Sequence, residues 1–520
     1  MKNIFVTSLI VLIVFLLNGC GGGGGGGGAN LSSSGNLNDA TSNQNSNSIL
    51  QTIVIPDAYD YYKDKCASPG IQFVIPVKLN DDNMQDFIVH YWCSQPLPWG
   101  REMTTATPDA LVAQVSQPDG TYKVANKQVF GSTFYGLGGA SRKFVRGDIN
   151  GDGRDDFAFA MNWEDGRLAS TPMTNATEPA VLMSQPDGGY RVVRLGVKNW
   201  NHSVEIVKNA NANDVVFAGF VRDIQAFRYF NGNFIDVSSE YNNQYSGTWA
   251  STFRAITDPV TGLVTRFAGA GNHQNTDTNT YSISEWGIRL FEKKSSDWTV
   301  LQEFWQRVSF TVNWISWQLT PGTNSVVAID GKQYFGGAYD EMCVMPPLTA
   351  NGPRLLIAKM GVAQDTKGRT LVAGQTYSEQ EATPVNIYSF FEIESTGGLK
   401  KISSPIVNEE IQSNFNFFDC KDINNDGYPD LVSYAFTRPG FNERVAEGGK
   451  PTIYINDKSG KLVKADVGYL PKNTAKSELQ SSMTDVNGDG NVDLLLYGSS
   501  AIGGGGEIKI NLLKSKIQLP

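Results

Sequence analysis

Three segments of the sequence repeat the spacing D-x-N-x-D-G-x-x-D, and each is followed by an apolar run. Side-chain oxygens at positions one, three, five and nine could surround calcium, which takes about six to eight oxygens at ~2.3–2.6 Å. The main-chain carbonyl of position seven could add an oxygen, and glycine at position six permits the sharp turn. The candidate ligands are Asp148, Asn150, Asp152, Arg154 and Asp156; Asp422, Asn424, Asp426, Tyr428 and Asp430; and Asp485, Asn487, Asp489, Asn491 and Asp493.

An EF-hand begins with a similar pattern, but it requires an acidic residue at position twelve and flanking helices. Position twelve is Phe159, Ser433 or Leu496 here, so the EF-hand interpretation fails. Acidic turns without metal are the alternative, and three copies at one spacing argue against it. We therefore predict about three structural Ca²⁺ sites. A fourth segment, residues 78–86, has Lys78 at position one, which argues against metal there.

Short strands separated by turn sequences are expected to carry these loops. Apolar or alternating runs lie at residues 73–77, 157–161, 215–220, 452–455 and 494–497. The turn sequence Ser-Gln-Pro-Asp-Gly occurs at 116–120 and again at 184–188, with looser hairpin copies at 229–234 and 455–462. Proline and glycine in such turns favour hairpins. The pattern indicates an all-β chain built from repeats.

The loop pattern resembles the FG-GAP repeat, also called the VCBS-type repeat, of integrin-α-like β-propellers. The resemblance implies a β-propeller over residues 50–520, with four-stranded blades and a calcium loop joining two strands of a blade. The loops are 70 residues apart from Lys78 to Asp148, 274 from Asp148 to Asp422, and 63 from Asp422 to Asp485. That spacing fits seven blades best, with three metal-free blades between those of Asp148 and Asp422, although six or eight blades also fit.

The N-terminus has the features of an exported lipoprotein. Lys2 precedes an apolar run that is too short to span a bilayer, which needs ~20 residues. The segment ending in Cys20 resembles a lipobox, which implies cleavage after residue 19 and lipidation of Cys20. Residues 20–49, rich in Gly, Ser and Asn, are expected to be a disordered tether. Gly21, in place of the aspartate that retains lipoproteins at the inner membrane, favours the outer membrane.

Removing Cys20 from the cysteine count leaves Cys66, Cys93, Cys343 and Cys420. An even number in an exported domain suggests two disulfides. Three pairings are open, and proximity in the sequence favours Cys66–Cys93 and Cys343–Cys420.

The composition narrows the function without naming a ligand. A net charge of −9 and a pI near 5.1 argue against a nucleic-acid partner. No HExxH or GxSxG motif occurs. The tripeptide at Arg146 to Asp148 matches the one that integrins bind, but Asp148 is needed in its loop. We expect a calcium-stabilised, membrane-anchored module at the cell envelope that binds an unknown protein or glycan, and that is not an enzyme. An envelope polysaccharide lyase or hydrolase on the same fold is the alternative, and an assembly scaffold is a lesser one.

Overall fold

The computed structural model is all-β in the part of the chain that it describes. It describes residues 50–56, 69–82, 84–93, 109–133, 135–139, 141–161, 177–199, 201–210, 212–219, 224–241, 249–276, 280–294, 297–313, 318–321, 326–365, 372–378, 381–402, 405–408, 418–433, 452–466, 479–484, 493–498 and 507–513. Within these ranges lie a short helix, α3 (Asn126–Phe130), and a 3-10 turn, η3 (Ser238–Glu240). No helix in the described ranges is long and apolar enough to cross a membrane.

The strands pair into antiparallel sheets that follow one another along the chain. Sheet 1 contains β2 (Pro69–Val77), β3 (Asp86–Cys93), β4 (Asp109–Ser116) and β5 (Tyr122–Val124). Sheet 2 contains β6 (Ser141–Gly147), β7 (Asp156–Met161), β8 (Ala180–Ser184) and β9 (Tyr190–Arg194). Sheet 3 contains β10 (Asn201–Lys208), β11 (Asn213–Gly219), β12 (Ile224–Phe230) and β13 (Asn233–Asp236).

The next two sheets are larger. Sheet 4 contains β14 (Trp249–Thr257), β15 (Val264–Thr276), β16 (Thr280–Lys294), β17 (Asp297–Asn313), β18 (Gln318–Pro321) and β22 (Tyr377–Ser378). Sheet 5 contains β19 (Val326–Ile329), β20 (Lys332–Met345), β21 (Leu355–Asp365), β23 (Ala382–Ile393), β24 (Leu399–Lys401) and β25 (Ile406–Asn408).

The C-terminal strands complete the sequence of sheets. Sheet 6 contains β26 (Phe418–Lys421), β27 (Asp430–Ser433), β28 (Thr452–Asn456) and β29 (Leu462–Lys464). The last strands are β30 (Leu479–Thr484), β31 (Asp493–Gly498) and β32 (Glu507–Leu513). β30 pairs with β31, and β32 lies beside β31. β32 also pairs with β1 (Leu50–Pro56), from Leu50 opposite Leu513 to Pro56 opposite Glu507. The first described strand therefore joins the last.

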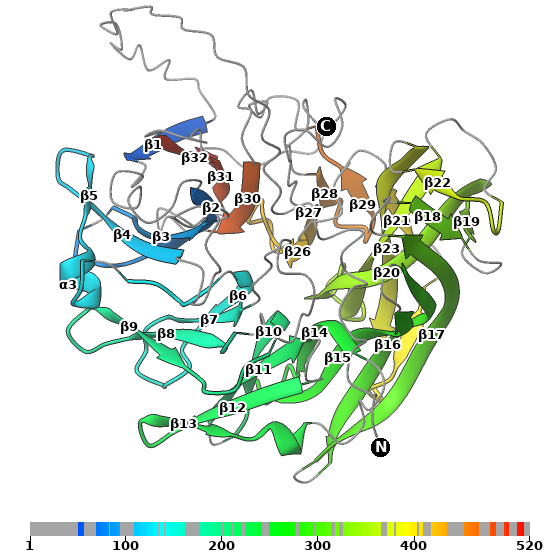
Figure 1. Cartoon of the computed structure of the whole chain (residues 1–520), viewed down its shortest axis with the longest axis horizontal. Coiled ribbons are helices and arrows are strands. Elements are labelled where there is room, and N and C mark those ends of the chain that lie inside the picture. Colours follow the sequence, from blue (N-terminus) through cyan, green and yellow to red (C-terminus); the bar gives the residue numbers. More distant parts are fainter. Residues whose placement is uncertain are drawn as a thin grey trace, which may run out of the picture.

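Figure 1 shows the sheets arranged around the molecule in chain order, with β6, β10, β14, β20 and β26 toward its middle. Each of these five strands lies beside the next one in that order. We call them the inner strands. Their convergence means that side chains far apart in the sequence can meet at the centre.

Adjacent sheets share their apolar cores. One core cluster joins sheets 1 and 2, another joins 2 and 3, a third joins 3 and 4, and a fourth joins 5 and 6. Middle strands such as β7 and β8 are buried along their whole length. Burial on both faces explains why their sequences are continuous apolar runs.

The expected strands and hairpins are confirmed. The runs at 73–77, 157–161, 452–455 and 494–497 lie in β2, β7, β28 and β31, and β11 covers residues 215–219. The two Ser-Gln-Pro-Asp-Gly copies form equivalent turns, in which Gly120 and Gly188 take φ of 82° and 88°. Each glycine N–H donates to the carbonyl of the glutamine, Gln117 or Gln185, at 2.8 and 2.9 Å.

Sheets 4 and 5 differ from the four-stranded unit that the resemblance implies. β15, β16 and β17 are 13, 15 and 17 residues long. The end of β17 pairs with β18, and β18 pairs with β22. Long strands leave main-chain N–H and C=O groups to be paired at their far ends, and the additional strands supply partners.

Candidate metal centre

The acidic loops occupy equivalent places in their sheets. Residues 148–156 connect β6 to β7, and residues 422–430 connect β26 to β27, in each case in the first hairpin of the sheet. Residues 78–86 connect β2 to β3 in the same way. In the third predicted site, Asp485, Asn487, Asp489 and Asn491 lie outside the described residues, and Asp493 is the first residue of β31.

In the loop 148–156, the carboxylate of Asp148 lies against the loop's own main chain. Its Oδ1 accepts hydrogen bonds from Gly151 N at 2.7 Å and Asp152 N at 3.1 Å, and its Oδ2 accepts one from Gly153 N at 2.9 Å. Gly153 has a φ of 82°, a conformation that side chains disfavour. Both ends of the tripeptide 146–148 therefore bind the loop: Asp148 through these hydrogen bonds and Arg146 through an ion pair with Asp155.

Asp156, the last residue of this loop, binds the main chain near the loop's beginning. It is fully buried, and its Oδ2 accepts hydrogen bonds from Ile149 N at 2.9 Å and Asn150 N at 3.3 Å. Its Oδ1 accepts one from Ser184 N at 2.8 Å, which ties the loop to the end of β8. Burial raises the pKa of Asp156, although these hydrogen bonds lower it. A nearby cation would favour the charged form.

The loop 422–430 repeats this geometry. Asp422 accepts hydrogen bonds from Asp426 N at 3.0 Å and Gly427 N at 2.7 Å. Asp430 accepts them from Ile423 N at 3.0 Å and Asn456 N at 2.8 Å. Burial raises the pKa of Asp430 to about 6, and the charges of Asp422 and Asp426 add to this rise. The carboxylates of this loop therefore repel one another in the absence of a cation.

The donor set of both loops is chemically suited to calcium. Position seven offers its main chain, because the Arg154 guanidinium bonds instead to the carbonyls of Gln185 and Pro186. Asn150 and Asn424 add amide oxygens. Among the described residues, no group of three or more His, Cys, Asp or Glu side chains is arranged to hold a metal ion. Calcium also accepts amide and main-chain oxygens, so the loops remain candidates on the chemistry of their donors.

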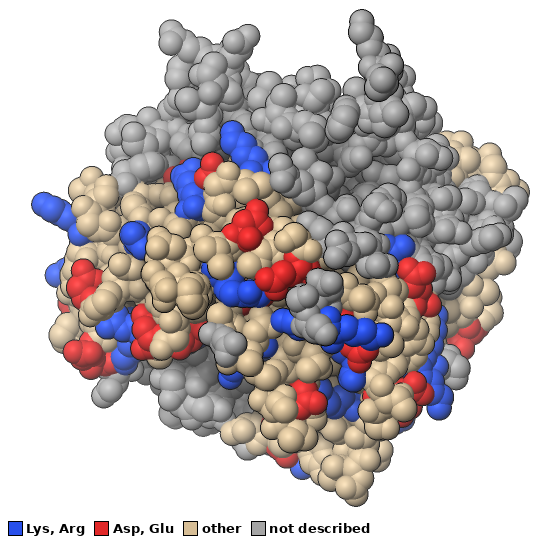
Figure 2. Space-filling view, turned by 90° about the horizontal axis from the view of Figure 1, so that it is seen from below, with Lys and Arg blue, Asp and Glu red and all other residues tan. Residues whose placement is uncertain are grey.

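A groove of about 820 Å³ separates the loops 78–86 and 148–156. Its lining is largely polar and includes Lys78, Asp81, Arg146, Asp155 and Asp187. Figure 2 shows basic and acidic side chains side by side on the face seen from below. A ligand in this groove would meet both signs of charge.

A second charged cluster lies where the inner strands converge, and the sequence did not predict it. Lys143 Nζ on β6 donates to Glu341 on β20 at 2.8 and 3.1 Å. Arg254 on β14 contacts Glu341 at 3.2 Å and Glu205 on β10 at 3.4 Å. We call these four residues the central ion-pair network. Their side chains are 9–17% exposed, so water reaches them only in part.

Burial and charge oppose each other within the network. Burial would raise the pKa of Glu341, but Lys143 and Arg254 hold it below the usual value. Burial lowers the pKa of Lys143, and the positive charge of Arg254 adds to that effect. Burial raises the pKa of Glu205, and Arg254 and Lys143 offset this only in part. Glu341 is therefore the carboxylate whose charged form the two cations stabilise by more than burial disfavours it. A charged residue between apolar neighbours, as Glu205 stands between Val204 and Ile206, is the signal that could have revealed it.

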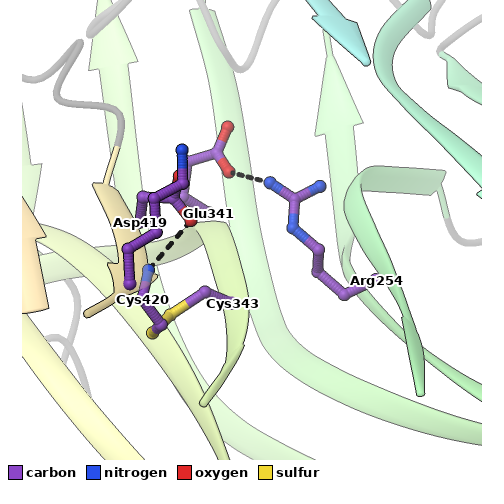
Figure 3. Close-up of a disulfide and its surroundings, with 6 residues drawn as sticks. Arg254, Glu341, Cys343, Asp419 and Cys420 are labelled. Atoms are coloured by element: carbon purple, nitrogen blue, oxygen red, sulfur yellow. Dashed lines mark hydrogen bonds and ion pairs between the residues drawn. A yellow bond between two sulfur atoms is a disulfide. The ribbon is translucent and has the colours of Figure 1, made fainter. Parts of the chain in front are cut away.

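A disulfide next to this network links two of the inner strands, β20 and β26. Cys343 on β20 and Cys420 on β26 are bonded, with their Cα atoms 5.9 Å apart. Figure 3 shows Asp419 and Glu341 close to this disulfide, with Arg254 approaching Glu341 from the other side. The bond ties sheet 5 to sheet 6. The other expected disulfide, Cys66–Cys93, stays a prediction, because Cys66 lies outside the described residues. Cys20 also lies outside them.

Comparison with known proteins identifies one repeat. Residues 422–496 match the family model of the FG-GAP-like repeat. This segment contains the loop 422–430 and the third predicted loop. No curated protein matches the chain.

Several solved structures are similar at low identity. They include an exotype rhamnogalacturonan lyase, YesX, which is 10% identical with a TM-score of 0.40 over 89% of this chain and 76% of that one. A rhamnogalacturonan lyase of Bacillus licheniformis, PL11, is 10% identical with a TM-score of 0.38 over the same shares. A glycoside hydrolase family 43 protein of B. licheniformis, YxiA, is 9% identical with a TM-score of 0.27 over 85% of this chain and 99% of that one.

Proposed function

We propose that residues 50–520 form a seven-bladed β-propeller. Sheets 1 to 6 supply six blades, and β30, β31, β32 and β1 supply the seventh. The pairing of β1 with β32 would close the ring between the two ends of the chain. The contact between Lys143 and Glu341 supports this arrangement, because it connects sheet 2 with sheet 5 across the centre.

We further propose that the loops 148–156, 422–430 and 485–493 each hold a structural calcium ion. Bound calcium would neutralise the carboxylates gathered in each loop, of which Asp430 has its pKa raised mainly by burial and further by the charges of Asp422 and Asp426. Because a ligand of the native state stabilises it, chelation should lower the melting temperature. The test is calorimetry of the full chain in calcium and in excess chelator, with magnesium as a control ion. Identical melting curves would exclude the calcium sites.

The protein is proposed to act from a membrane, through a lipid on Cys20. The support is the apolar segment that ends at Cys20 and the glycine-rich tether after it. Several acyl chains together give stable anchoring. Cys20→Ser should abolish incorporation of a labelled fatty acid and release the protein from the membrane fraction. Gly21→Asp should keep the lipid but move the protein from the outer to the inner membrane. Membrane association of Cys20→Ser would contradict the anchor.

The function we propose is binding of a protein or glycan at the cell envelope. The observation that carries it is the FG-GAP-like repeat at 422–496, set among consecutive four-stranded sheets. The polar groove between the loops 78–86 and 148–156 offers a surface for such a ligand. The test is to screen the full chain, in calcium and in chelator, against panels of glycans and envelope proteins. Saturable binding that Asp81→Ala and Asp187→Ala weaken is expected, and binding that both variants retain would exclude the groove.

An enzyme acting on polysaccharide is the second candidate. The observation in its favour is the group of carboxylates near the centre, from Glu205, Glu341 and Asp419. Each of them has a cation beside it, Asp419 being 3.0 Å from Lys421, which is the arrangement of a structural network. The same polysaccharide panel decides the matter if new reducing ends or unsaturated sugars are measured. Product formation that Glu341→Gln abolishes in a folded protein would favour the enzyme.

A further inference from the structure

The loop 78–86 shares the hydrogen-bond frame of the two calcium-type loops. In each loop the position-nine aspartate accepts a bond from the position-two N–H and another from the end of the third strand. The position-two bonds are 2.7, 2.9 and 3.0 Å for Leu79 to Asp86, Ile149 to Asp156 and Ile423 to Asp430. The third-strand bonds are 2.8 Å each for Ser116, Ser184 and Asn456.

The middle of the loop is also equivalent. The position-three amide donates to the position-five carboxylate at 2.9, 3.0 and 3.2 Å, through Asn80, Asn150 and Asn424. The position-seven N–H donates to the other oxygen of that carboxylate at 2.8, 2.9 and 2.9 Å, from Met84, Arg154 and Tyr428. The hydroxyls of Ser116 and Ser184 make the same 2.9 Å bond, to Asp82 and Asp152. These positions of the loop 78–86 therefore match the others.

Among the predicted ligand positions, position one is where the loops differ in charge; position six, which supplies no ligand, is Asn83 in place of glycine. Asp148 and Asp422 present carboxylates to the N–H groups of their own loops. In the first loop, the ammonium of Lys78 turns inward instead and donates to the main-chain carbonyl of Asp82. A main-chain oxygen at position five of the loop therefore contacts a cationic group of the chain itself, as the position-seven carbonyl is expected to contact calcium in the other loops.

The charges of the two kinds of loop balance in the same way. Positions one, five and nine of the loop 148–156 carry three carboxylates, which a divalent ion would bring to a net charge of −1. The same positions of the loop 78–86 carry Lys78, Asp82 and Asp86, which already amount to −1. The lysine supplies the neutralisation that the other loops would need from an ion.

We propose that Lys78 is a built-in cation, so that the first hairpin keeps a calcium-loop fold without calcium. Replacing Lys78 by aspartate would restore the complete ligand pattern and create a further calcium site. This inference rests on the calcium sites proposed for the other loops. Among the hairpins that carry an acidic loop, it separates those that depend on calcium from the first one, which does not.

Calcium binding to the full chain tests the proposal directly. Titration calorimetry should show one more ion per chain for Lys78→Asp than for the natural protein. Lys78→Met should bind the natural number of ions and should melt at a lower temperature in both calcium and chelator. Lys123→Asp, an exposed lysine on β5, is the matched control for the added negative charge and should gain no site. An unchanged ion count for a folded Lys78→Asp would overturn the proposal.

Hydrogen exchange of the natural protein gives a test that needs no variant. Chelation should increase exchange in the hairpins around 148–156 and 422–430 and leave the hairpin around 78–86 unchanged. Equal loss of protection in all three hairpins would show that the first loop also depends on an ion, and would overturn the proposal. If the natural protein bound no calcium while Lys78→Asp bound one ion, the sites at the other loops would fail and the role of Lys78 would stand.

Discussion

Neutralising Glu341 should destabilise the protein more than neutralising any exposed carboxylate. Its side chain is 9% exposed and contacts both Lys143 at 2.8 Å and Arg254 at 3.2 Å. Glu341→Gln keeps the shape and one acceptor oxygen, but it leaves two cations close together with Glu205 as their remaining partner in the network. The change therefore isolates the charge from the packing.

The magnitude follows from the burial of the network. Breaking a buried pair by removing one partner costs ~3–5 kcal/mol. Because the four side chains keep 9–17% of their surface in contact with solvent, we expect the lower end of that range, about 3 kcal/mol. Unfolding entropy of ~2.1 cal/mol/K per residue over roughly 450 residues amounts to about 1 kcal/mol/K. The melting temperature should therefore fall by about 3 °C.

Scanning calorimetry at a fixed calcium concentration measures this shift. The matched control is Glu303→Gln, since Glu303 is 40% exposed in its pair with Arg289 and such pairs contribute ~0.2–1 kcal/mol. A double variant, Lys143→Met with Glu341→Met, should recover part of the loss, because apolar residues can replace a buried ion pair. Equal melting temperatures for Glu341→Gln and Glu303→Gln would refute the reasoning that the central network is buried and coupled.

Three further predictions follow from the same contacts. The cations around Glu341 hold its pKa below the usual value, so its stabilisation is complete above that value and is lost as the pH falls through the folded-state pKa. The stability gap between Glu341→Gln and the natural protein should therefore narrow below about pH 4.3, as calorimetry across pH would show, and a constant gap would contradict it. Replacing Cys343 and Cys420 together by serine should lower the free energy of unfolding, measured with denaturant, by ~2–4 kcal/mol. Reductant should then destabilise the variant less than the natural protein. Equal destabilisation of both by reductant would show that the disulfide on which stability depends lies elsewhere. Asp156→Asn should lower the melting temperature even in chelator, because its NH2 group cannot accept a hydrogen bond that the buried carboxylate now receives. It should also diminish the rise in melting temperature on adding calcium, and an undiminished rise would remove Asp156 from the ligand set.

Local features of the fold could be predicted because their causes are local. The turn Ser-Gln-Pro-Asp-Gly forms equivalent hairpins at residues 116–120 and 184–188 because proline and glycine restrict the chain within a few residues. Buried strands such as β7 were visible as apolar runs. The sixth strand of sheet 4 was not predicted, since β22 joins this sheet by pairing with β18, which is distant in sequence.

The candidate site divides in the same way. The spacing of acidic residues identified the loops 148–156 and 422–430, because the hydrogen bonds of each loop join residues two to seven positions apart. The sequence also showed that Lys78 stands where the other loops have aspartate, but only the structure showed that its ammonium contacts the main-chain carbonyl of Asp82.

The sequence by itself determined the turns, the strands marked by apolar runs and the oxygen-bearing residues of the acidic loops, all of which arise from neighbouring residues. Only the tertiary structure decided which strands lie at the centre and therefore which charges meet. Lys143 and Glu341 are 198 residues apart, and nothing near either of them specifies the other. Their contact exists because consecutive sheets turn around a common centre, where β6 and β20 bring opposite charges together in a place that water reaches only in part.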